Sequence, residues 1–151
     1  MFSLEQVFDV AGKSVIVTGG ASGIGRAYSE VMADSGARVC IFDIDPVGLD
    51  ATVADLTASG CDVWGQIVDV SDRSAMAAAF DKVSAQHGQI DVVFANAGID
   101  PGPGFMTPEG VRNPDGAIEN IDEDQWDRGI EVNLTSVYTT VKNAVRHMTQ
   151  T

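Results

Sequence analysis

Thr18-Gly19-Gly20-Ala21-Ser22-Gly23-Ile24-Gly25 is the stretch that decides the fold, because its glycines stand between an apolar, β-branched run and a stretch with helical periodicity. Glycines let a backbone turn tightly and approach a pyrophosphate, and the free N–H groups of a following helix attract its negative charge. The sequence therefore predicts a phosphate-binding turn between a first strand and a first helix. The residues expected to line this turn are Gly19, Ser22, Gly23, Ile24 and Gly25. A glycine-rich turn that serves packing alone is the alternative.

On either side of this turn, short apolar runs alternate with longer helical stretches, which is the pattern of a parallel sheet with helices on its faces. The expected strands lie at residues 14–18, 38–42, 63–68 and 90–95. These runs are apolar enough for strands that are covered on both faces. The sequence therefore predicts an α/β fold with a parallel sheet.

The helices expected between the strands each carry an apolar stripe that packs on the core. The stripe of the first helix is formed by Ile24, Ala27, Tyr28 and Val31. This helix is expected to end at Gly36, a typical C-cap. The second helix is expected to begin near Pro46, and the third to be capped by Ser71 and to end at residues 87–88.

Residues 99–121 interrupt this pattern, because prolines and glycines punctuate them without a period. A loop of this length in a compact domain is usually functional or disordered, so we expect a substrate-side flap or a mobile surface. After the loop, Asp122 and Gln125 have the spacing of a capping box, which predicts a helix that runs toward the C-terminus. The excess of acidic residues over arginines between residues 100 and 131 indicates a solvated rim rather than an acid–base site.

Composition narrows the classes of partner and compartment. A net charge of −13 repels phosphate backbones and anionic headgroups, so neither nucleic acid nor a membrane surface is an expected partner. The two cysteines have no CxxC spacing and no histidine cluster beside them, so neither a disulfide framework nor a metal site is indicated. This cysteine content is consistent with a protein of the reducing cytoplasm. His87 and His147 lie near expected helix ends, where we expect surface or capping roles. Segment 1–6 shows no export signal and no apolar run reaches the roughly 18 residues of a membrane helix, so we expect one cytoplasmic domain over residues 1–151.

The glycine turn resembles that of the short-chain dehydrogenase/reductase family, which reads Thr-Gly-x-x-x-Gly-Ile-Gly. Further segments follow in the order of that family, namely Asp43, Asp69-Val70, Asn96-Ala97-Gly98 and Asn133-Leu134. Ala95 stands where the family usually has another Asn. The resemblance spans essentially the whole chain. It implies a Rossmann-type, doubly wound parallel sheet with strands in the order 3-2-1-4, the C-terminal strands of the family being missing.

NAD is the cofactor that these residues favour. The carboxylate of Asp43, at the end of the second strand, can accept hydrogen bonds from the adenosine ribose hydroxyls and repel a 2′-phosphate. No Lys or Arg stands in the glycine turn before Gly25 to attract that phosphate. The resemblance further implies that Asp69 meets the exocyclic amine of adenine and that Val70 contacts its ring. The alternatives are a methyltransferase-like ribose contact for Asp43 and a helix-side role for Asp69 beside the Ser71 cap.

The resemblance also implies roles for the two asparagine segments. Asn96, Ala97 and Gly98 bring small residues to the end of the fourth strand, where a flat ring must lie close to the backbone. Asn133 is the expected catalytic contribution of this chain, because its counterpart in the family helps to hold a proton-relay water. A plain strand-ending turn and a surface asparagine are the alternatives.

The catalytic Ser and Tyr-x-x-x-Lys of the family lie beyond the helix that carries Asn133. Tyr138 and Lys142 have the right spacing but follow Asn133 on the same helix, so we interpret them as a coincidental match. We expect a dinucleotide-binding domain truncated before the catalytic segment, inactive in isolation and a dimer or tetramer when intact. The expected activity of the intact enzyme is NAD(H)-dependent hydride transfer between a secondary alcohol and a ketone. A non-catalytic nucleotide-binding or regulatory module and a methyltransferase-like nucleoside binder are the alternatives.

Overall fold

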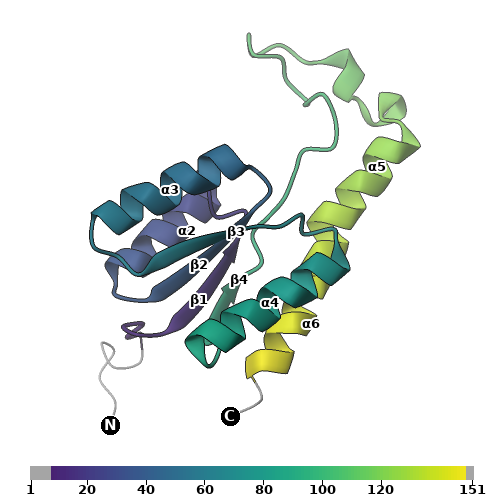
Figure 1. The fold of residues 1–151 in the computed structure, drawn as a ribbon. Helices are drawn as coiled ribbons and strands as arrows, with labels where there is room; N and C mark the ends of the chain where they lie inside the picture. The colour runs from purple at the N-terminus through teal and green to yellow at the C-terminus, as the bar shows by residue number, and fades with distance from the viewer. Residues whose placement is uncertain (1–7, 149–151) are drawn as a thin grey trace.

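A computed structural model describes residues 8–148, so the segment 1–6 considered above lies outside the described residues. Parallel strands form one sheet in the order β3-β2-β1-β4 (Figure 1). The strands are β1 (Ser14–Thr18), β2 (Arg38–Asp43), β3 (Val63–Ile67) and β4 (Val92–Phe94). The predicted strand order is confirmed. β2 runs one residue beyond its expected end, whereas β3 and β4 are shorter than expected.

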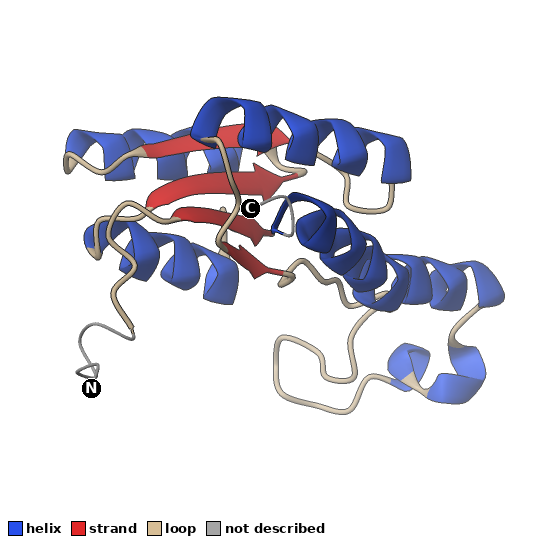
Figure 2. Ribbon diagram, turned by 90° about the horizontal axis from the view of Figure 1, so that it is seen from below, coloured by secondary structure: helices blue, strands red, loops and turns tan. Residues whose placement is uncertain are grey.

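Helices cover both faces of this sheet (Figure 2). The α-helices of residues 8–148 are α2 (Gly23–Asp34), α3 (Pro46–Ala58), α4 (Arg73–His87), α5 (Glu123–Ile130) and α6 (Ser136–Met148). α2 and α3 pack on one face, and α4 and α6 pack together on the other. The predicted doubly wound arrangement is therefore confirmed.

Alternation along the strands produces two hydrophobic cores, because successive side chains point to opposite faces of a sheet. Ile16 and Phe42 point toward α4 and α6, where the Phe42 ring meets Phe80 edge to face with centroids 5.7 Å apart. Val17 and Ile41 point toward α2 and α3. All five side chains are fully buried, and each such burial contributes about 1.5–3 kcal/mol. The buried strands therefore hold the loops at their carboxyl ends in fixed positions.

The apolar stripe predicted for α2 is wrong. Ile24 and Val31 are 69% and 63% exposed, and Ala27 and Tyr28 are exposed as well. The buried face is formed by the small residues Gly25, Ser29 and Ala33. The Ser29 hydroxyl lies close enough to the glycine turn to donate to the Gly20 carbonyl oxygen at 3.1 Å. The pattern failed because close approach to the turn requires small side chains, not apolar ones.

The sequence predicted Ser71 as the cap of α4, but the cap is Asp72. Asp72 Oδ1 accepts hydrogen bonds from the backbone N–H groups of Ser74 and Ala75, both at 2.9 Å. Ser71 instead donates its hydroxyl to Asp69 at 2.7 Å. An ionised carboxylate is a stronger acceptor than a hydroxyl at the positive end of a helix, which is why the aspartate takes this place.

The helix predicted after the long loop begins where expected and then changes its pitch. The capping box is confirmed, since Asp122 Oδ1 accepts from Gln125 N at 2.7 Å and the Gln125 side chain accepts from Asp122 N. A π-helical turn at Glu131–Thr135 joins α5 to α6 and carries Asn133. Such turns re-aim the side chains that they carry and are frequent at functional sites.

The loop at residues 99–121 extends away from the sheet (Figure 1). Within it, Met106 and Arg112 form an isolated antiparallel bridge, and short 3-10 helices follow at Pro114–Gly116 and Ile118–Asn120. The loop therefore has local structure that its proline and glycine content did not indicate. Over residues 8–148, no helix has the length and apolar character needed to cross a membrane.

Candidate functional site

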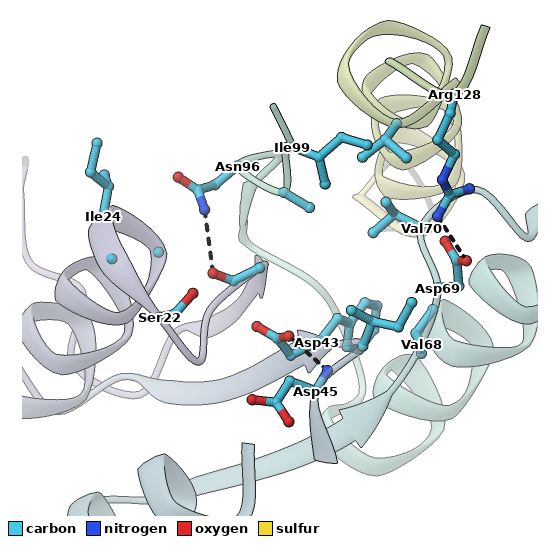
Figure 3. A pocket seen from close by; sticks show the side chains of 18 residues that line it. Ser22, Ile24, Asp43, Asp45, Val68, Asp69, Val70, Asn96, Ile99 and Arg128 are labelled. Atoms are coloured by element: carbon cyan, nitrogen blue, oxygen red, sulfur yellow. Dashed lines mark hydrogen bonds and ion pairs between the residues drawn. The ribbon is translucent and has the colours of Figure 1, made fainter. Parts of the chain in front are cut away.

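A cavity of about 500 Å³ lies at the carboxyl ends of the strands (Figure 3). Of its 18 lining residues, 11 are the positions that the sequence predicted as cofactor contacts. They come from the end of β2, from the turns that follow β1, β3 and β4, and from the first residues of α2, and the sheet brings these segments together. The lining residues that were not predicted are Phe42, Ile44, Asp45, Val68, Ile99, Arg128 and Val132.

The glycine turn after β1 has no room for side chains at Gly19 and Gly25. Gly19 has a φ of +64°, and a Cβ there would lie 2.9 Å from Ala97 Cα. A Cβ on Gly25 would overlap the Gly19 carbonyl oxygen and approach Asn96 Nδ2 to 2.5 Å. Ser22 makes no capping hydrogen bond, and the first turn of α2 holds no acidic residue. The positive end of the α2 dipole therefore faces the cavity uncompensated by a side-chain carboxylate of that turn.

Asp43 ends β2 with its carboxylate held by backbone groups. Its Oδ2 accepts from Ala21 N at 3.0 Å and its Oδ1 from Asp45 N at 3.1 Å. Each carboxylate oxygen can accept a further hydrogen bond, so these contacts orient the group without saturating it. Asp45 in turn caps α3 by accepting from Val47 N and Gly48 N. Two carboxylates thus stand together on this side of the cavity (Figure 3).

Thr18, which was not predicted as a functional residue, joins β1 to the segment after β4. Its buried hydroxyl donates to Phe94 O at 3.2 Å and accepts from Asn96 N at 3.0 Å and Ala97 N at 3.1 Å. Asn96 returns a side-chain hydrogen bond to Thr18 O at 3.1 Å. These bonds fix Asn96 and Ala97 in the cavity wall. The sequence signal for this role was the position of Thr18 as the first residue of the glycine-rich stretch, directly at the end of the first strand.

Asp69 lines the cavity and contacts Arg128 of α5. Its Oδ1 accepts from the N–H and the hydroxyl of Ser71 at 2.9 and 2.7 Å, and its Oδ2 accepts from Arg128 Nη2 at 3.2 Å. Burial acts to raise the pKa of Asp69, but the hydrogen bonds from Ser71 and Arg128 outweigh it and hold the pKa below its ordinary value. Asp69 is therefore an ionised acceptor at neutral pH. Only a weak signal pointed to Arg128, namely its isolation within an acidic segment.

Asn133 holds the segment that follows β4 by hydrogen bonds to its backbone. Its Oδ1 accepts from Ile99 N and its Nδ2 donates to Ile99 O, both at 2.8 Å. A Cβ on Gly98 would lie 3.2 Å from the same Oδ1. Asn133 does not line the cavity itself, whereas Ile99 and Gly98 do. The structure therefore brings the other predicted residues into one cavity and places Asn133 directly behind its wall.

Tyr138 and Lys142 lie outside this site. Tyr138 is 62% exposed on α6, and the Lys142 ammonium lies 5.8 Å from the centroid of its ring. Neither side chain lines the cavity. In the described part of the chain, residues 8–148, no group of three or more His, Cys, Asp or Glu side chains is arranged to hold a metal ion.

Comparison with known proteins finds relatives of about twice the length. Residues 13–151 match the family model described as short chain dehydrogenase. The chain is 36% identical over 138 residues to the cis-4-hydroxycyclohexanecarboxylate dehydrogenase of Sinomonas cyclohexanicum. This alignment covers 91% of this chain and 50% of that protein. It is 32% identical over 143 residues to the short chain dehydrogenase/reductase dpchG of Colletotrichum higginsianum, covering 92% and 47%.

The solved structures give the same picture. A short chain dehydrogenase/reductase from Burkholderia phymatum, in complex with NAD, is 30% identical and matches 93% of this chain and 46% of its own, with a TM-score of 0.81. The chain thus spans about half the length of the curated relatives and solved structures named here.

Proposed function

Because the chain belongs to the short-chain dehydrogenase/reductase family, we propose that it binds NAD(H) in the cavity as the cofactor-binding part of an oxidoreductase. The proposed reaction is hydride transfer between a small secondary alcohol and its ketone. One observation carries the proposal, namely that the predicted cofactor contacts from separate turns line a single cavity. The solved relative in complex with NAD supports the choice of cofactor.

The cavity has a suitable size and suitable polar groups for a dinucleotide. Its volume of about 500 Å³ falls within the range of about 300–1,000 Å³ that is usual for ligand pockets. The side-chain-free turn at Gly19 and Gly25 lets a pyrophosphate approach the backbone and the α2 dipole. Asp43 offers oriented oxygens to a ribose diol. Val68 and Val70 provide apolar walls for a flat ring.

The pair of carboxylates favours NAD over NADP. Asp43 and Asp45 both line the cavity where β2 ends. The 2′-phosphate of NADP brings up to about two negative charges, and like charges brought together repel one another. No Lys or Arg stands in the glycine turn before Gly25 to offset that repulsion.

The residues of this chain bind the cofactor and shape its surroundings. When bound, the nicotinamide supplies or accepts the hydride. Asn96, Ala97 and Gly98 present a wall with little side-chain bulk, and Asn133 holds that wall through Ile99. Hydride transfer between an alcohol and a ketone also needs a positioned proton donor, which must reach the reacting oxygen directly or through a water.

Titration of the 151-residue protein with NADH, followed by nicotinamide fluorescence, tests the proposal. We expect saturable binding that NAD competes away and that S-adenosylmethionine leaves unchanged. Folded protein that shows no saturable NADH binding would contradict the proposal. Binding of S-adenosylmethionine in its place would support a methyltransferase-like nucleoside site.

A non-catalytic nucleotide-binding module is a second candidate, favoured by the exposed position of Tyr138 away from the cavity. Both candidates predict NADH binding, so binding alone does not separate them. The mass of the intact protein isolated from its natural source separates the two candidates. A product well beyond 151 residues supports the enzyme, because the further chain has room for the Ser and Tyr-x-x-x-Lys of the family.

A further inference from the structure

Arg128 reaches from α5 to the turn between β3 and α4 (Figure 3). Its Nη2 donates to Asp69 Oδ2 at 3.2 Å, and its Nη1 donates to Ser71 Oγ at 2.7 Å. Ser71 in turn donates its hydroxyl to Asp69 Oδ1 at 2.7 Å. The three side chains form a closed ring of hydrogen bonds between segments that are far apart in the sequence.

This ring fixes the direction of the Asp69 carboxylate. Ser71 belongs to the same turn as Asp69 and donates only to Oδ1, whereas the guanidinium of Arg128, on α5, donates to Oδ2. A planar guanidinium fixes the orientation of its acceptors as well as attracting them. The two side chains are 45% and 35% exposed, and ion pairs of such exposure contribute little to stability. The effect of the ring is therefore mainly on geometry.

The surroundings of Asp69 indicate what the carboxylate would meet. Val68 and Val70 flank it in sequence and line the cavity, as does Val132, which lies one helical turn after Arg128. Apolar side chains that line a cavity together with an ionised acceptor complement a flat aromatic ring that carries an amine. The exocyclic amine of adenine is such a group.

We propose that Arg128 is a positioning residue that aims the Asp69 carboxylate at the exocyclic amine of the adenine ring. Arg128 thereby lets the cavity distinguish adenine from a purine with a carbonyl oxygen at that position. The inference rests on the proposed binding of NAD(H), and its test distinguishes a failure of the role given to Arg128 from a failure of the proposed function.

The test compares NADH with its analogue in which hypoxanthine replaces adenine and a carbonyl replaces the amine. We expect the wild-type protein to bind NADH about tenfold or more tightly than the analogue, and Arg128→Met to lower that ratio about tenfold by weakening NADH binding. Other contacts of the ring act on both proteins and cancel in the comparison. Arg128→Lys keeps the charge but not the two-pronged contact, so its ratio should fall between the two.

Arg73→Met is the matched control. Arg73 Nη2 lies 3.8 Å from Glu131 Oε1, so it also connects the start of α4 to the helix after the loop, without contacting Asp69. This variant should retain the wild-type ratio.

Three outcomes overturn the inference while leaving the proposed function intact. They are equal binding of both dinucleotides by the wild-type protein, an unchanged ratio in Arg128→Met, and an equal loss of affinity for both dinucleotides in that variant. The last result would mean that Arg128 is only a structural tie. Absence of NADH binding by the folded wild-type protein would instead overturn the proposed function.

Discussion

Among single residues, Asp43 has the most direct effect on cofactor choice. Backbone N–H groups of Ala21 and Asp45 orient its two oxygens toward fixed directions. A hydrogen bond to a charged group contributes about 1.5–3 kcal/mol, and about 1.4 kcal/mol corresponds to tenfold in affinity. We expect NADH to bind at least about tenfold more tightly than NADPH, and Asp43→Ser to reduce the preference to about twofold. Fluorescence titration with both cofactors measures this ratio.

Asp50→Ser controls for net charge, because it removes the same charge from an exposed position on α3 that does not line the cavity. Its preference for NADH should equal that of the wild-type protein. Equal dissociation constants for NADH and NADPH in the wild-type protein would contradict the role given to Asp43.

His87 lies at the other end of the sheet and differs from its predicted surface or capping role. Trp64 Nε1 donates to His87 Nε2 at 3.2 Å, so the ring is neutral and its Nδ1–H can donate to Ser14 Oγ, 2.8 Å away. Burial lowers the pKa of His87 and the charge of Arg38 lowers it further, whereas Asp62 opposes both. The unfolded state therefore binds more protons just below the ordinary pKa of about 6.5. Stability should fall as the pH drops through this range.

Thermal unfolding at about pH 7.5 and about pH 5.5 tests this dependence. We expect the wild-type Tm to fall more than that of His87→Gln, which has no group titrating at this position. The pKa of Asp69 and that of Asp91 are lowered, so their contribution to stability is lost only at more acidic pH. Equal Tm losses in the two proteins would show that His87 has no part in the pH dependence.

Among the elements, the strands were predictable and parts of the helices were not. The apolar, β-branched run at 14–18 has few alternatives to a buried strand. The cavity followed from the turns after the strands, because a parallel sheet brings its carboxyl ends to one edge. The face of α2 was mispredicted, because Gly25 and Ser29 carry no hydrophobic signal. The contact of Arg128 with Asp69 spans 59 positions, which no local pattern reveals.

The π-helical turn shows the same limit of local patterns. It aims the Asn133 amide at the backbone of Ile99, and a sequence that fits a continuous helix does not indicate this change of pitch. His147 is a further example, since its side chain is 9% exposed and its ring stacks on Phe80, although a surface or capping role was expected. α6 buries it by packing against α4.

Removing the Asn133 amide should loosen the cavity wall. Each of its two hydrogen bonds to Ile99 contributes about 0.5–1.5 kcal/mol, so we expect Asn133→Ala to lower the free energy of unfolding by about 1–3 kcal/mol. NADH affinity should fall severalfold, because Gly98 and Ile99 line the cavity. Urea denaturation and NADH titration measure the two effects. Asn120→Ala is the control, since it removes a hydrogen bond to Pro114 O away from the cavity and should leave NADH affinity unchanged.

For the molecule as a whole, the apolar face of α6 predicts self-association. Tyr138 and Val141 lie on α6 and are 62% and 51% exposed, and Leu134, in the π-helical turn just before α6, is 63% exposed. Exposed apolar side chains gathered on one element commonly mark an interface. We expect sedimentation velocity to show association that grows with protein concentration, and Val141→Glu to weaken it. Val47→Glu makes the same change on α3, at a position that is 76% exposed, and should not weaken it.

The last prediction concerns catalysis by the 151-residue protein. A proton donor must come within about 2.6–3.2 Å of the reacting oxygen, directly or through one water. Tyr138 is exposed on α6 and does not line the cavity, with Lys142 beside its ring. We therefore expect no NADH formation from NAD and a panel of secondary alcohols, and no change in NADH affinity in Tyr138→Phe. Loss of a true proton donor lowers rates by about 10²–10⁴. Measurable turnover that falls by this factor in a folded Tyr138→Phe protein would make Tyr138 the proton donor and would overturn the cofactor-only role of this chain.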